Sequence, residues 1–245
     1  MSVTLSLQAA GGSDVGLVRR RNEDAIYLGQ NLFAVADGLG GHIAGDVAST
    51  TAINALSRHD RLVDPAALAT TLGRAVRAAN DALSQRIKAE PGLAGMGTTL
   101  VAMLRSGETA VLANVGDSRA YLLRSSSARE IGRTSQITED HTYQHLVADA
   151  GMVPNLPERL SRFIDGRPDG RSPDITTWHL SPGDRFLLCS DGLSTYVGHH
   201  LIHAALSAGG TPNQAVGHLI NLAMSHGAPD NVTVIVLDVH GGEGA

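Results

Sequence analysis

The spacing of apolar residues changes near residue 92, and this change constrains the fold more than any other feature of the sequence. From Asp64 to Ala89 apolar residues recur at helical intervals, and Asp64 and Pro65 are suited to begin that helix. The apolar stripe consists of Leu68, Leu72, Val76, Ala79, Leu83 and Ile87. After Pro91, strand-like patterns joined by short turns follow at 98–104, 108–116, 119–124 and 129–138. A long helix followed by such a meander differs from the alternation of a doubly wound sheet.

Shorter patterns complete the expected order of elements. Strands are predicted at 3–9, at 31–37, on both sides of the Pro182-Gly183 turn, and at 231–239. Helices are predicted at 45–56, 141–151, 199–210 and 212–227. This order favours antiparallel sheets with helices packed outside them.

Composition limits the classes of function. The 245 residues suffice for one large domain, and aromatic residues make up only 3%, so aliphatic side chains must fill its core. A net charge of −5 provides no basic surface for nucleic acid or an anionic membrane. One cysteine excludes a disulfide framework, and no signal peptide or membrane-spanning run is recognised. We therefore expect a soluble, cytoplasmic monomer.

Four aspartates stand beside a glycine, serine or asparagine where an apolar run closes: Asp37, Asp117, Asp191 and Asp230. One such aspartate is usually a turn former or a helix cap, but four in one chain suggest a common role. Glycine after Asp37 lets a cation approach both the carboxylate and the Gly38 carbonyl oxygen. An all-oxygen site favours Mg²⁺ or Mn²⁺ over Zn²⁺, and two ions sharing Asp37 could support hydrolysis at phosphorus.

The segment 13–25, "SDVGLVRRRNEDA", supplies cations and further carboxylates. One of the three arginines at 19–21 can bind a phosphate in bidentate fashion, whereas a solvated turn explains the other two. Glu23 and Asp24 are placed to orient metal-bound waters.

Seven segments, in order, resemble the metal-dependent protein phosphatase family (PPM, also called type 2C) in its bacterial form. They are "SDVGLVRRRNEDA", "VADGLGGHIAGDVAS", "GMGTTLVA", "ANVGDSRAYLLR", "QITEDHT", "PGDRFLLCSDGLS" and "GAPDNVTVIVLDV". The resemblance implies an α/β (α+β) four-layer sandwich, with two central antiparallel β-sheets flanked by α-helices on both faces. It also implies hydrolysis of phosphoserine and phosphothreonine on proteins by a metal-bridging hydroxide. The alternative is a catalytically weak domain of the same fold that regulates or binds a phosphorylated partner.

The resemblance assigns metal ligands residue by residue. Asp37 would bridge two core ions, Mn²⁺ or Mg²⁺, and Gly38 would give its carbonyl oxygen to one of them. Asp191 and Asp230 would hold the other ion. Asp117 matches the ligand of a third ion in bacterial members. The implied partners are phosphorylated Ser/Thr proteins and a cognate Ser/Thr kinase.

Further roles come from the same comparison. Arg19 would bind the substrate phosphate, and Glu23 and Asp24 would arrange metal-bound water. Animal-type members have a histidine, the proposed general acid, where this chain has Leu39. His42 is the usual bacterial residue nearby; it is the candidate general acid here, although it could simply cap the next helix.

The resemblance implies a single domain at 1–240 and a C-terminal tail at 241–245. A variable flap is expected at about 152–174, where four prolines and four arginines predict irregular structure. Arg162 takes the place of the flap arginine, but the histidine that often begins the flap is missing. Substrate selection is therefore the property least open to transfer.

Other chemistries fit poorly. A cysteine-dependent phosphatase needs an arginine six positions after its nucleophile, where Cys189 is followed by Thr195. A haloacid-dehalogenase-type enzyme needs a second aspartate two positions after Asp37, where Leu39 stands. Cys189 is better explained as a buried small hydrophobe.

Histidines at helical spacing suggest zinc, but the pattern is incomplete. His141 and His145 form one such pair, with Thr142 where a zinc protease has glutamate, and a second group lies at 199–203. We interpret both groups as surface or packing histidines.

Overall fold

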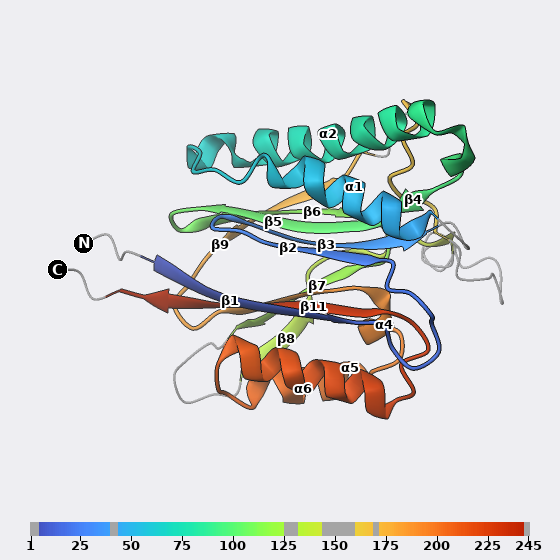
Figure 1. The fold of residues 1–245 in the computed structure, drawn as a ribbon. Helices are drawn as coiled ribbons and strands as arrows, with labels where there is room; N and C mark the ends of the chain where they lie inside the picture. The colour runs from blue at the N-terminus through green and yellow to red at the C-terminus, as the bar shows by residue number, and fades with distance from the viewer. Residues whose placement is uncertain (1–4, 40–43, 125–131, 144–159, 169–171, 243–245) are drawn as a thin grey trace.

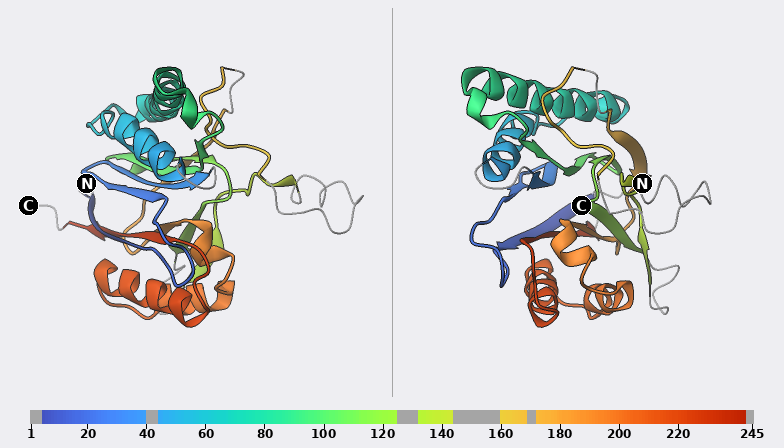
Figure 2. Two further views of the ribbon diagram at one scale, coloured as in Figure 1. Left: turned by 45° about the vertical axis from the view of Figure 1, so that its right-hand side comes forward. Right: turned by 90° about the vertical axis from the view of Figure 1, so that its right-hand side faces the viewer.

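The computed structural model describes residues 5–39, 44–124, 132–143, 160–168 and 172–242. In this part of the chain two antiparallel sheets pack face to face, and helices cover the outer face of each (Figures 1 and 2). These four layers confirm the predicted sandwich. No helix within the described ranges is long and apolar enough to span a membrane.

The first sheet, lower in Figure 1, has the strand order β1-β11-β10-β7-β8. Its strands are β1 (Leu5–Asp14), β11 (Val232–Gly241), β10 (Arg185–Cys189), β7 (Arg119–Arg124) and β8 (Arg133–Gln136). Three helices lie on its outer face: α4 (Asp191–Ser194), α5 (His199–Ser207) and α6 (Pro212–Ser225). Thr211 and Gln214 form a capping box that fixes the start of α6.

The second sheet has the order β2-β3-β5-β6-β9, with a short β4 paired to the end of β3. Its strands are β2 (Asp24–Leu28), β3 (Leu32–Leu39), β4 (Gly97–Thr98), β5 (Leu100–Ser106), β6 (Thr109–Val115) and β9 (Asp174–His179). Helices α1 (Gly45–Ser57) and α2 (Leu68–Ala89) cover its outer face. Two 3₁₀ turns, Pro65–Ala67 and Pro91–Leu93, flank α2.

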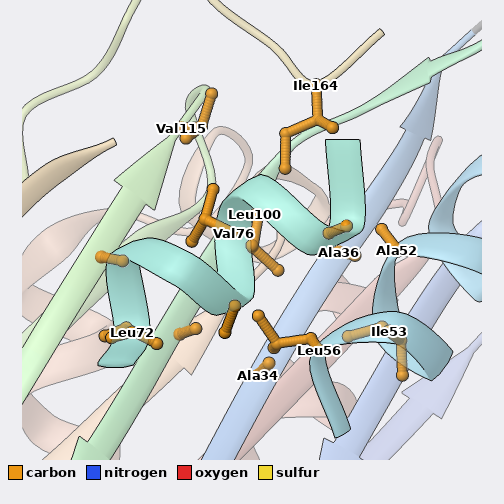
Figure 3. Packing of buried hydrophobic residues seen from close by; sticks show 14 of the residues in the cluster. Ala34, Ala36, Ala52, Ile53, Leu56, Leu72, Val76, Leu100, Val115 and Ile164 are labelled. Carbon is orange, nitrogen blue, oxygen red and sulfur yellow. The ribbon is translucent and has the colours of Figure 1, made fainter. Parts of the chain in front are cut away.

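Aliphatic side chains fill three apolar layers, as the low aromatic content requires. Figure 3 shows the layer between the second sheet and its helices, where Leu72 and Val76 of α2 and Leu56 of α1 meet Ala34 and Leu100. The small alanines of β3 let α1 approach the sheet closely. This packing holds the end of β3, where Asp37 lies, in a fixed place.

The sequence-based elements are largely confirmed. Asp64 accepts a hydrogen bond from Ala66 N, so it caps the segment as expected, but the first turn is 3₁₀ rather than α. The prediction of one continuous meander was wrong, because the chain crosses between the two sheets from β6 to β7 and again from β8 to β9. The predicted helix at 141–151 lies mostly outside the described residues, and β2 and α4 were not predicted.

Candidate metal centre

A cavity of about 510 Å³ opens at the end of the sandwich where β3 ends and α4 begins, on the right of Figure 1. Five acidic residues predicted for the site border it: Glu23, Asp37, Asp117, Asp191 and Asp230. Gly38 and the arginines at 19–21 border it as well. Residues far apart in sequence therefore converge here because both sheets end at the same edge.

The end of β3 holds Asp37 and Gly38 through their backbones. Asp37 N donates to Thr99 Oγ1 over 3.1 Å, and Thr99 N donates back to Asp37 O over 2.8 Å. Gly38 N donates to Glu23 O over 3.2 Å. A Cβ on Gly38 would collide with the backbone carbonyl of Gly45, so α1 can begin this close to β3 only when glycine follows Asp37.

Asp24 lies behind the cavity rather than on it. It stands directly opposite Asp37 in the β2–β3 register, and Ser190 Oγ donates to its Oδ2 over 2.8 Å. Ser190 precedes Asp191, and its Oγ also accepts a hydrogen bond from Thr233 N. Asp24 thus connects the strand that bears one predicted ligand to the turn that bears another.

Burial dominates the electrostatics of these carboxyl groups. Although Asp37 keeps some surface toward the cavity, burial raises its pKa well above the ordinary value, and the charge of Asp24 raises it further. Burial raises the pKa of Asp24 to about 6 and, with the charge of Asp191, that of Asp117 to about 7. Burial and the charge of Asp230 also raise the pKa of Asp191. Without a cation, these groups destabilise one another's ionised forms.

This set fits a hard divalent cation. Buried Oδ1 atoms of Asp24 and Asp191 have no hydrogen-bond partner, so each retains an oxygen free to accept a proton or to face positive charge. A cation would relieve both the missing partners and the mutual repulsion. Within the described ranges no three His, Cys, Asp or Glu side chains are already gathered around one point. The carboxylates instead border an open space, which leaves positions for water and substrate.

A loop at residues 15–22, which we call the arginine loop, forms the outer rim of the cavity. Asn231 holds it through the backbone, since Asn231 Nδ2 donates to Val15 O and Arg21 O over 2.9 Å each. Asn231 Oδ1 accepts from Glu23 N over 2.8 Å. Arg19 Nη2 lies 2.6 Å from Asp230 Oδ2, on a side chain that is 55% exposed. Asn231 was not predicted as a site residue, although it stands next to a predicted ligand.

The loop that carries Asp117 is held from the opposite side by Asp140 and His141. Arg119 makes a bidentate ion pair with Asp140, and its Nη2 lies 2.6 Å from Asp140 Oδ2. Gly116 N donates to His141 Nδ1 over 3.0 Å. Of the two interpretations of His141, as a surface or a packing histidine, the second is confirmed, because only 3% of it is exposed and it is hydrogen-bonded on both ring nitrogens.

The remaining predicted residues fall into two groups. His42 and most of the predicted flap lie outside the described residues. Arg162, within the described end of that segment, binds Asp174 with Nη1 2.7 Å from Oδ1. Cys189 is fully buried, and burial raises its pKa to about 12, which agrees with its interpretation as a small hydrophobe.

Comparison with known proteins gives consistent matches. A family model described as protein phosphatase 2C matches residues 17–147. The chain is 43% identical over 244 residues to the serine/threonine protein phosphatase PstP of Mycobacterium tuberculosis, covering 97% of this chain and 46% of that protein. It therefore spans about half the length of this relative. It is 33% identical to the serine/threonine phosphatase stp of Listeria monocytogenes, covering 92% of this chain and 93% of that protein.

Solved structures agree with the fold. A crystal structure described as the catalytic domain of PstP in complex with two manganese ions superposes with a TM-score of 0.87 at 43% identity. The superposition covers 97% of this chain and all of that one. A bacterial serine phosphatase superposes equally well, with a TM-score of 0.87 at 31% identity, over 98% of this chain.

Proposed function

Because this chain belongs to the protein phosphatase 2C family, we propose that it hydrolyses phosphoserine and phosphothreonine in proteins with the help of divalent cations. The observation that carries the proposal is the group of buried carboxyl groups with raised pKa at an open cavity whose rim bears Arg19. With divalent cations held by these carboxylates, the arrangement would suit a phosphate dianion, which needs positive charge on several sides.

Five residues would hold the cations in this proposal. Asp37 and the Gly38 carbonyl oxygen would bind one ion, and Asp37, Asp191 and Asp230 the other, with Asp117 available to a third. Two Mn²⁺ or Mg²⁺ ions would supply Lewis acidity. They would lower the pKa of water enough for it to lose a proton near neutral pH and attack phosphorus. A relative's structure with two manganese ions supports two core ions for this chain.

The chain's own groups would position the substrate and water. Arg19 would turn its guanidinium from Asp230 to the phosphate oxygens, a move that its exposed position permits and that would leave Asp230 free for a cation. Glu23, whose backbone is fixed by Asn231, borders the cavity and would orient water there. Asp24 would act from behind by keeping β2 and Asp191 in place.

The proposal extends to partners. The substrates would be phosphorylated Ser/Thr proteins, a cognate Ser/Thr kinase among them, and the enzyme would act as a cytoplasmic monomer with one catalytic domain at 1–240. The names of its relatives support the substrate class. Size-exclusion chromatography with light scattering would test the oligomeric state.

Phosphate release from phosphoserine, phosphothreonine and phosphotyrosine peptides tests this function. We expect release from the first two peptides with Mn²⁺ or Mg²⁺, and none with a chelator. Binding of a phosphopeptide without turnover in Mn²⁺ would instead identify a regulatory domain of the same fold. If the protein shows no turnover and no binding of the phosphopeptide, both functions are refuted.

A further inference from the structure

Two consecutive residues, Asp140 and His141, grip both flanks of the loop that carries Asp117. His141 contacts Gly116 twice, since its backbone N donates to Gly116 O over 3.0 Å while its Nδ1 accepts from Gly116 N over 3.0 Å. Asp140 binds Arg119 on the other flank, with two Nε contacts of 3.0 Å each. We call this pair of residues the Asp140–His141 clamp.

The hydrogen bonds of His141 fix the position of its proton. Nδ1 accepts a hydrogen bond from Gly116, so it is unprotonated, and Nε2 must donate the proton to Asp174 Oδ2, 2.9 Å away. Arg162 in turn binds the same carboxylate, with Nη1 2.7 Å from Oδ1. The imidazole is therefore held at both nitrogens in a single tautomer and orientation.

The loop that carries Asp117 has a constrained backbone and a destabilised carboxylate. Gly116 has φ of +114°, and a Cβ there would overlap the Thr99 side chain, so this turn permits little except glycine. Ser118 Oγ lies 2.7 Å from Thr99 Oγ1, the same atom that accepts from Asp37 N. Asp117 itself lies in an environment that disfavours its charge. A loose loop would turn this carboxylate away from the cavity.

We propose that the Asp140–His141 clamp is a positioning device that holds the Asp117 carboxylate toward the cavity. His141 acts through the Gly116 amide and touches neither substrate nor cation. The inference rests on the proposed metal-dependent function, and it assigns a role to the "EDHT" motif that the function alone leaves unexplained.

Two matched substitutions separate positioning from packing. His141→Asn retains an acceptor near the place of Nδ1 and so can still bind the Gly116 amide, whereas His141→Gln places its amide near Nε2 and loses that acceptor. His203, which bonds Thr134 from α5 and does not border the cavity, supplies His203→Gln as a control. Hydrogen exchange of residues 114–119 is measured in the metal-free protein, and activity is measured as a function of Mn²⁺ and phosphopeptide.

In His141→Gln, we expect the loop amides to exchange about tenfold faster. We also expect the Mn²⁺ concentration for half-maximal activity to rise about 10- to 100-fold, with little change in peptide KM. His141→Asn should recover most of both effects, and His203→Gln should show neither. Unchanged exchange and Mn²⁺ dependence in His141→Gln would overturn the proposal. If the wild type itself shows no turnover, the proposed function fails, and exchange in metal-free protein still decides the role of the clamp.

The arginine loop carries a second, independent inference. Arg20 and Arg21 border the cavity, are exposed, and have no ion pair among the described residues. Asn231 nevertheless binds the backbone carbonyl of Arg21, so this part of the loop is anchored while the side chains stay exposed. Leu17 and Val18, beside them, are 65% and 68% exposed.

Three neighbouring guanidinium groups repel one another, and within the described part of the chain only Arg19 has a carboxylate to offset this. We infer that Arg20 and Arg21 bind acidic side chains next to the phosphorylated residue, so that acid-flanked phosphopeptides are preferred substrates. Leu17 and Val18 give the same peptide an apolar surface. This inference also rests on the proposed phosphatase function and names the class of its substrates.

The test compares two phosphothreonine peptides that differ only in having Glu or Gln beside the phosphorylated residue. We expect kcat/KM to favour the acidic peptide about tenfold at low salt, as two exposed ion pairs would give. In Arg20→Gln/Arg21→Gln the preference should nearly disappear, because kcat/KM for the acidic peptide should fall about tenfold more than kcat/KM for the neutral peptide.

The control is Arg74→Gln/Arg77→Gln, which removes equal charge from exposed positions of α2 outside the cavity lining. It should keep the preference. Equal hydrolysis of both peptides by the wild type, or a preference that survives in Arg20→Gln/Arg21→Gln, would overturn the inference. Hydrolysis of neither peptide would count against the phosphatase function instead.

Discussion

The two walls of the cavity are held in opposite ways. The inner wall includes the loop that carries Asp117. There the side chains of Ser118 and Arg119 bind other residues of the protein, and the Asp140–His141 clamp holds the loop on both flanks. On the outer rim, Asn231 holds the arginine loop by its backbone carbonyls and leaves its side chains toward solvent. The difference suggests a division of labour. Carboxylates that must face a cation need fixed side chains, whereas recognition of varied substrates needs side chains that remain free on a fixed backbone.

The largest effect is expected on the inner wall. Asp37→Asn removes the carboxylate that both cations would share in the proposed function, and it should lower kcat/KM for a phosphopeptide roughly a thousandfold or more. The metal-free protein should not lose stability, because burial already disfavours the charge of Asp37. Steady-state kinetics and urea unfolding measure both quantities. Asp81→Asn, an exposed change on α2, is the control and should leave both unchanged. Activity of Asp37→Asn within tenfold of wild type would contradict the assignment of Asp37 as a ligand.

On the outer rim, the backbone anchor should matter more than any single exposed side chain. Asn231→Ala removes three hydrogen bonds from a residue that is 5% exposed, and should lower the free energy of unfolding by about 3 kcal/mol. It should also raise peptide KM, since the arginine loop would lose its fixed backbone. Asn22→Ala, which removes only local hydrogen bonds at the end of the same loop, should have a smaller effect. Equal effects of the two substitutions would show that Asn231 is not the main anchor.

The difference between the walls also explains how far the sequence could predict the site. Asp37, Asp117, Asp191 and Asp230 were recognisable because each ends an apolar run beside a small or amide residue, and this local pattern places them at strand ends. Asn231 and His141 were not recognised for their roles, because those roles exist only in contacts with residues far away in the chain. Asn231 reaches a residue 216 positions earlier, and nothing in the local sequence marks that pairing.

In the fold as well, local features could be predicted from the sequence and features that depend on distant contacts could not. Helix α2 followed from apolar periodicity and helix-start residues, and α1 followed from its small and apolar residues, because these are properties of neighbouring positions. The crossing from β6 to β7 between sheets did not follow, because Gly116 and Asp117 look like an ordinary hairpin turn. The distinction between a hairpin and a crossing depends on which face of each strand is buried against the other sheet.

Titration of the buried Asp24 carboxyl group should change the free energy of unfolding by about 3 kcal/mol. The pKa of Asp24 is raised from 3.8 to about 6, so the folded protein binds more protons than the unfolded chain between these values. The stability contributed by protonated Asp24 is full below about pH 4 and is lost as pH rises through about 6. Metal-free protein should therefore become less stable over this window, as denaturant unfolding at several pH values would show. Asp24→Asn should flatten the slope, and an equally steep slope in that variant would assign it to other groups.

The smallest expected effect comes from the same chemical change made once on each wall. Arg19→Lys keeps the charge at the rim but loses the bidentate geometry, so peptide KM should rise about tenfold. Its exposed ion pair with Asp230 contributes little to folding, and the free energy of unfolding should change by less than about 1 kcal/mol. Arg119→Lys breaks a bidentate contact with Asp140 that is largely shielded from water, so it should lower stability and raise the Mn²⁺ requirement while peptide KM stays constant. Kinetics at several Mn²⁺ concentrations and unfolding of both variants give the comparison. The same pattern in both variants would show that the two walls do not divide positioning from recognition, because a shared network would then carry both.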